Sequence, residues 1–65
     1  MTTESDRAEL SALVSQLEDL TERMVAVADR YRTSESSAAV ADLDAAERNL
    51  LSARRSLTRA IADLT

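Results

Sequence analysis

Two apolar stripes with heptad spacing, one in each half of the chain, constrain the fold more than any other feature. Members of each stripe are separated alternately by three and four residues, the spacing that places side chains on one face of an α-helix. The first stripe runs through Leu10, Leu13, Leu17, Leu20, Met24, Val27 and Tyr31, and the second through Ala39, Leu43, Ala46, Leu50, Ala53, Leu57, Ala60 and Leu64. Each half of the chain is therefore predicted to form an amphipathic helix.

The two stripes match one another when the chain is folded back on itself. Leu20 then faces Leu50, and Leu13 faces Leu57. Alanine alternates with leucine in the second stripe, and its small side chain lets two helices approach closely. The pattern predicts an all-α fold, a two-helix antiparallel coiled-coil hairpin.

The composition favours long helices in a single domain spanning residues 1–65. The chain contains no Gly and no Pro, so it carries no helix breaker. We expect one helix over about 6–32, a joint at 33–37 and a second helix over about 37–63. Thr3 and Asp6 are spaced to form a capping box before the first helix, and Ser34 or Ser36 is suited to be the N-cap of the second.

One unbroken helix of roughly 90 Å, paired with a parallel copy, is the alternative that the absence of Gly and Pro leaves open. Two features favour the hairpin. Tyr31 and Ala39 are eight residues apart where a continuous heptad requires seven. Each helix also begins acidic and ends basic, so only an antiparallel fold sets each acidic end beside a basic one.

The two edges of the predicted hairpin differ in polarity. One edge carries only polar residues, namely Glu9, Gln16, Arg23, Arg30, Glu35, Asp42, Asn49, Ser56 and Asp63, and we expect it to be solvated. The other edge is largely apolar, and a two-helix hairpin has no third element to cover it. We expect its residues to form an interface, made by Val14, Val25, Ala28, Val40, Glu47, Leu51, Arg54 and Ile61.

The small size of the chain points to association through this apolar edge. Below about 70–80 residues, a single core rarely contributes more than about 3–5 kcal/mol. Two copies would then form a four-helix bundle, with Glu47 of one copy near Arg54 of the other. The alternative is a small regulator or adaptor whose apolar edge receives a helix of a different protein.

The residues needed for most catalytic chemistry are missing. The sequence has no His and no Cys, which removes the commonest general base and thiolate chemistry. Glu18 and Glu22 share a helix face with Asp19 nearby, but such a group makes a poor metal cage. We therefore expect a protein that is not an enzyme and has no cofactor or metal. An anion held by Arg54, Arg55 and Arg59, or an enzyme site formed between subunits, is the minor alternative.

The net charge of −4, from 12 acidic and 8 basic residues, argues against a nucleic-acid partner, because phosphate neutralisation supplies most non-specific affinity. No apolar run approaches the roughly 20 residues that span a bilayer, so no membrane partner is expected. The first residues are polar and acidic, unlike a secretory signal. The expectation is thus a cytoplasmic interaction module that binds itself or a helix of another protein.

Overall fold

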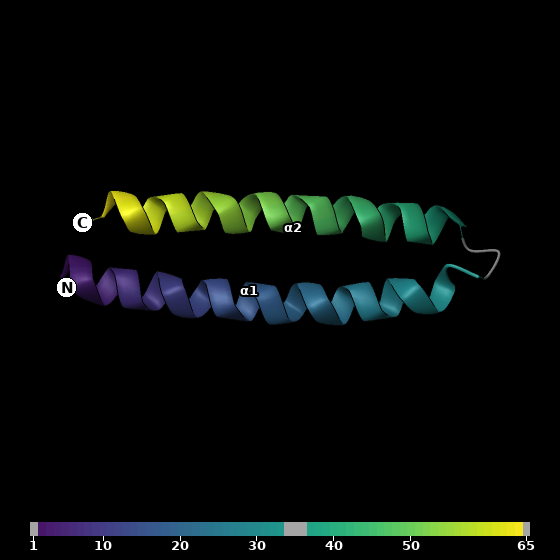
Figure 1. Ribbon diagram of the computed structural model, residues 1–65, viewed down its shortest axis with the longest axis horizontal. Helices are drawn as coiled ribbons and strands as arrows, with labels where there is room; N and C mark the ends of the chain where they lie inside the picture. Colours follow the sequence, from purple (N-terminus) through teal and green to yellow (C-terminus); the bar gives the residue numbers. More distant parts are fainter. Residues whose placement is uncertain (1, 34–36, 65) are drawn as a thin grey trace.

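The chain folds into a hairpin of two long helices, as a computed structural model of residues 2–33 and 37–64 shows. Helix α1 spans Thr3–Tyr31 and helix α2 spans Ser37–Asp63. They lie side by side over their whole length and run in opposite directions, so both ends of the chain lie at one end of the rod (Figure 1). The rod measures 50 × 15 × 13 Å. The predicted all-α hairpin is confirmed, and the single unbroken helix is wrong.

The start of α1 differs from the prediction. Thr2, rather than Thr3, is the N-cap, and its Oγ1 accepts a hydrogen bond of 3.1 Å from the backbone N–H of Ser5. Thr2 has extended backbone angles, φ −110° and ψ 158°, which let its side chain reach the free N–H groups of the first turn. Thr3 is already helical, so the predicted capping box is wrong and α1 begins three residues earlier than expected.

The other helix ends lie close to the predicted positions. Helix α1 ends at Tyr31, followed by Arg32 in a helical conformation as the C-cap. Helix α2 begins at Ser37 and ends at Asp63, as predicted. The candidate N-caps Ser34 and Ser36 lie outside the described residues.

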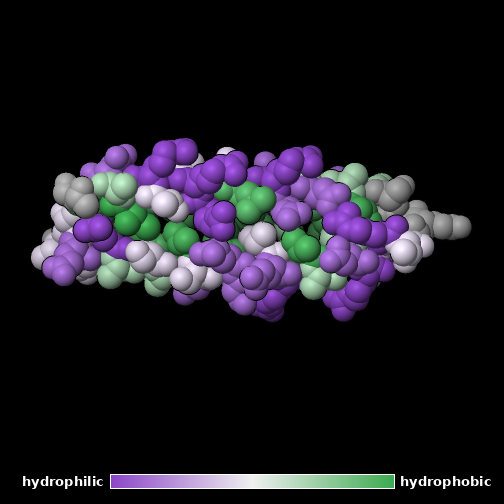
Figure 2. Space-filling view, in the orientation of Figure 1, coloured by the Kyte–Doolittle hydropathy of each residue, from purple (hydrophilic) through white to green (hydrophobic). Residues whose placement is uncertain are grey.

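A seam of partly buried side chains runs between the two helices. Its residues again alternate in steps of three and four. They are Leu10, Val14, Leu17, Thr21, Met24 and Ala28 of α1, Val40, Leu43, Glu47, Leu50, Arg54, Leu57 and Ile61 of α2, and Leu64 directly after α2. Ala28, 2 % exposed, is the most deeply buried side chain of the described residues. On one face of the rod, hydrophobic residues gather along the line between the helices and hydrophilic residues cover the outer sides (Figure 2).

The seam is rotated by one residue row from the predicted position on both helices. Leu13, Leu20 and Tyr31, predicted to lie at its centre, are 42 %, 50 % and 46 % exposed. The alanines Ala39, Ala53 and Ala60 are exposed as well. On α1 the seam instead contains the residues one position later, beginning with Val14 after Leu13. On α2 it contains the residues one position after the alanines, beginning with Val40 after Ala39.

The rotation has a physical reason in the width of the apolar stripes. Each helix carries three neighbouring apolar rows, whereas a seam between only two helices uses two of them. On α2, the row with Val40 and Ile61 replaces a row made only of alanine. Complete burial of Val or Ile contributes about 1.5–3 kcal/mol and an alanine methyl contributes less, so the rotation buries more apolar surface at Val40 and Ile61. The same row also brings Glu47 and Arg54 into the seam, and on α1 the rotation exposes Leu13 and Leu20.

Polar residues of the seam are accommodated locally. The hydroxyl of Thr21 donates a 2.7 Å hydrogen bond to the carbonyl oxygen of Leu17, one turn earlier in the same helix. Glu47 and Arg54 are only partly buried, a position in which a long side chain packs its methylene stem and keeps its charge near water. The seam therefore holds two charged residues without enclosing their charges.

Candidate interaction surface

Two flanks border the seam, one on each side. Because an α-helix has about 3.6 residues per turn, the residues just before and just after a seam position lie on opposite sides of it. In an antiparallel pair, equivalent rows of the two helices meet at the same edge. We call one edge the Leu–Ala flank, formed by Leu13, Leu20, Val27, Ala39, Ala46, Ala53 and Ala60. The other is the charged flank, formed by Glu18, Val25, Arg32, Asp44, Leu51 and Thr58.

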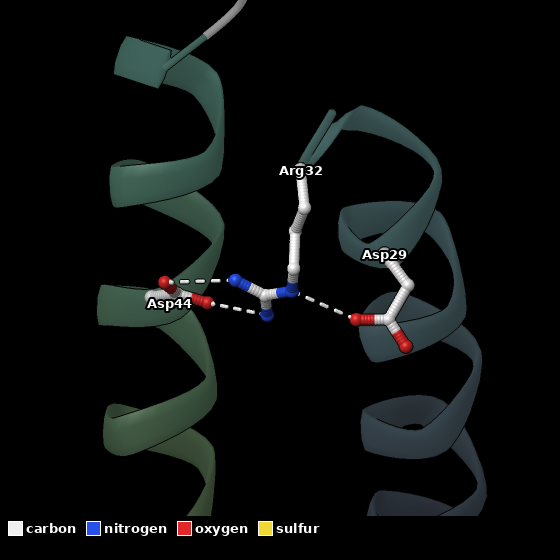
Figure 3. A network of polar contacts seen from close by, with 3 residues as sticks. All are labelled: Asp29, Arg32 and Asp44. Atoms are coloured by element: carbon white, nitrogen blue, oxygen red, sulfur yellow. Dashed lines mark hydrogen bonds and ion pairs between the residues drawn. The ribbon is translucent and has the colours of Figure 1, made fainter. Parts of the chain in front are cut away.

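The charged flank is closed by ion pairs between the helices. Arg32 makes a forked contact with Asp44 of α2, with Nη2–Oδ1 at 3.0 Å and Nη1–Oδ2 at 3.4 Å. Its Nε also donates to Oδ1 of Asp29 at 2.8 Å, so the guanidinium lies between two carboxylates (Figure 3). Nearer the middle of the rod, Arg54 Nη1 lies 3.8 Å from Glu18 Oε2. Arg32 at the end of α1 thus lies beside Asp44, as the antiparallel charge pattern predicted, although the first turn of α2 carries no acidic residue.

The Arg32–Asp44 contact changes the acidity of both groups. The hydrogen bond from Arg32 lowers the pKa of the Asp44 carboxyl below its ordinary value of 3.8, and the charge of Arg48 lowers it further. The hydrogen bonds to Asp44 and then to Asp29 raise the pKa of Arg32 above its ordinary value. Both partners therefore remain charged at neutral pH. Because the side chains of Arg32 and Asp44 are still 42 % and 35 % exposed, the pair aligns the helix ends more than it stabilises the fold.

The Leu–Ala flank has no such cover. Leu13 and Leu20 line a hollow together with Leu17 and Leu57 of the seam and Gln16 at its outer border. A second hollow continues along α1 past Leu20, Met24 and Val27, with Arg23, Ala26 and Arg30 at its border. On α2 the flank consists of alanine alone, with Ala39, Ala53 and Ala60 exposed and Ala46 partly buried. The result is an apolar strip with a ridge of large side chains on α1 and a flat row on α2.

The residues that the sequence predicted to form an interface do not lie on the Leu–Ala flank. Ala28 is 2 % exposed in the single chain, so the expectation that the hairpin leaves it open is wrong. The remaining residues are all partly buried: Val14, Val40, Glu47, Arg54 and Ile61 belong to the seam, and Val25 and Leu51 to the charged flank. The predicted neighbour of Arg54 was Glu47 of a second copy, whereas within the chain Arg54 contacts Glu18.

Sequence reasoning missed the Leu–Ala flank because it placed those residues inside the hairpin. The available signal was the width of the apolar stripe on α1, where Leu13 and Leu20 are immediately followed by Val14 and Thr21. A third apolar row of this kind marks a helix with more than one neighbour. The sequence alone does not specify which of the three rows stays outside.

The polar clusters that the sequence singled out are engaged in local contacts. Arg54, Arg55 and Arg59 border a hollow with Val14, Glu18 and Thr58, but Arg54 is engaged by Glu18 and Arg59 Nη2 donates to Ser56 Oγ at 3.2 Å. Within residues 2–33 and 37–64, no three acidic side chains are grouped so that they could hold a metal ion. Neither helix, over its described residues, has an apolar stretch long enough to cross a bilayer.

Comparisons with protein-family models, with curated proteins and with solved structures find no match for this chain. The feature that the fold of one chain does not account for is the exposed row of Leu13 and Leu20.

Proposed function

We propose that this chain is a non-enzymatic protein–protein interaction module that self-associates through the Leu–Ala flank, two hairpins together forming a four-helix bundle. The observation that carries the proposal is the choice of rows on α1. The hairpin places Val14, Thr21 and Ala28 in its seam. It leaves the row of larger residues at its edge, where Leu13 and Leu20 are exposed and Val27 is partly buried. Exposed leucine side chains do not stabilise a single hairpin. A second hairpin that covers the flank would bury them and stabilise the dimer.

The size of the flank supports this proposal. The flank extends from Ala39 to Ala60 on α2, about 31 Å at 1.5 Å per residue, so a second hairpin can contact it over several helical turns. Complete burial of a leucine contributes about 1.5–3 kcal/mol, so covering the half-exposed Leu13 and Leu20 adds about 1 kcal/mol for each. Every such contact occurs twice in a symmetric dimer.

The width of the apolar stripes supports the same conclusion. A seam between two helices needs two apolar rows, whereas a helix in a bundle usually carries three. Both α1 and α2 carry a third row, and both third rows lie on the same flank. The absence of His and Cys from the sequence further supports a role in binding rather than in catalysis.

Thermal unfolding at different protein concentrations tests self-association. Association that accompanies folding raises the midpoint of unfolding as the concentration increases, because the dimer is favoured by mass action. We expect the Tm followed by circular dichroism to rise steadily over an about 100-fold range of concentration. A Tm that stays constant over this range, with the helices intact at low temperature, would contradict self-association.

A further inference from the structure

We infer that in the dimer the leucine row of α1 lies over the alanine row of the partner's α2, so that each α1 has two α2 neighbours, its own and the partner's. This inference rests on the proposed function and adds the orientation of the second copy. It corresponds to a two-fold axis along the length of the rod. The other two-fold arrangement, with its axis across the rod, sets α1 on the partner's α1 and α2 on the partner's α2.

The sizes of the facing side chains favour the inferred orientation. On α1 the flank carries Leu13, Leu20 and Val27, and on α2 it carries only alanine. A large residue facing a small one lets two helix surfaces interdigitate at an even distance. In the other arrangement one contact would be leucine on leucine and the second alanine on alanine, so the two hairpins would meet as a wedge.

The levels of these residues along the rod match as well. Thr21 and Leu51 line one hollow, and Arg54 Nη1 lies 3.8 Å from Glu18 Oε2, which places each of these pairs at about the same level of the rod. Leu20 is therefore within about two residues of the level of Ala53, or about 3 Å at 1.5 Å per residue. A two-fold axis along the rod leaves these levels unchanged. The partner's Ala53 consequently lies near Leu20 without any sliding of the chains.

The charges beside the flank favour the inferred orientation at the end of the rod where α1 ends and α2 begins. Arg30 is exposed beside the flank on α1, and Asp42 is exposed beside it on α2. The inferred orientation brings Arg30 close to the partner's Asp42. At the opposite end it brings Glu9 near the partner's Asp63, and the repulsion between these two carboxylates offsets the attraction of Arg30 for Asp42. Side-chain size therefore determines the orientation.

Disulfide trapping tests the orientation, because the chain contains no cysteine of its own. Leu20→Cys and Ala53→Cys proteins are mixed in a glutathione redox buffer, and the products are identified by mass. A disulfide needs Cα atoms about 4.4–6.8 Å apart. We expect the mixed Leu20→Cys/Ala53→Cys dimer as the main product, and the same result for Leu13→Cys mixed with Ala60→Cys. As the control, Leu20→Cys mixed with Leu51→Cys on the charged flank should give no mixed product.

The outcomes separate this inference from the proposed function. A dimer of Leu20→Cys with itself as the main product would show α1 against α1 and overturn the orientation while keeping the flank. A protein that sediments as a dimer but forms neither disulfide would also overturn the orientation. A protein that sediments as a single chain in the same buffer would overturn the self-association on which the inference depends.

Discussion

Arg32 connects the end of α1 to the first turns of α2 through Asp44, and this contact makes the hairpin sensitive to acid. The pKa of Asp44 is lowered in the folded chain, so its contribution to stability is fully present above its ordinary value of 3.8. That contribution is lost as the pH falls through the lower pKa of the folded state, because the protonated carboxyl no longer attracts Arg32.

Replacing Asp44 with asparagine is therefore expected to lower the free energy of unfolding slightly at neutral pH and to have almost no effect well below pH 3.8. Urea unfolding at the two pH values measures the difference. In the background of Arg32→Gln, the same substitution should have a much smaller effect at neutral pH, because the partner is already gone. A cost that is unchanged in acid would show that Asp44 acts by some means other than its charge.

At the scale of the element, the first turn of α1 separates the predicted helix start from the observed one. Thr2 Oγ1 accepts the hydrogen bond from Ser5, whereas Thr3 lies inside the helix. We expect Thr2→Ala to destabilise the chain by about 1 kcal/mol, the usual cost of removing an N-cap. Thr3→Ala should be nearly neutral, since alanine is the better helix former. Urea unfolding compares the two variants, and the reverse order would restore Thr3 as the cap.

The spacing of apolar residues was sufficient to predict both helices and, together with the charges, their antiparallel course. It was not sufficient to predict which side of each helix faces the other. Leu13 and Val14 are neighbours in sequence, and either one completes a regular stripe with Leu10 and Leu17. The choice depends on how the side chains of both helices fill the space between them, which is a property of the pair and not of either pattern alone.

At the scale of the whole molecule, this rotation moves the apolar edge from one side of the hairpin to the other. The sequence predicted exposure at Val14, Ala28 and Ile61, and the fold draws these into the seam. An apolar edge remains, as the sequence indicated, but it is formed by Leu13, Leu20 and the alanines. The two edges therefore make opposite predictions about which leucine a second chain would touch.

The mass of the chain in solution, measured by sedimentation equilibrium for the native protein and for Leu20→Glu and Leu51→Glu, tests the Leu–Ala flank most directly. Native protein and Leu51→Glu should have about twice the 7.1 kDa of one chain. Leu20→Glu should sediment as one chain that keeps its helices, because Leu20 is half exposed in the hairpin and a buried unpaired charge is costly only in the dimer. A dimer that survives Leu20→Glu but is lost with Leu51→Glu would contradict this account and place the interface on the charged flank.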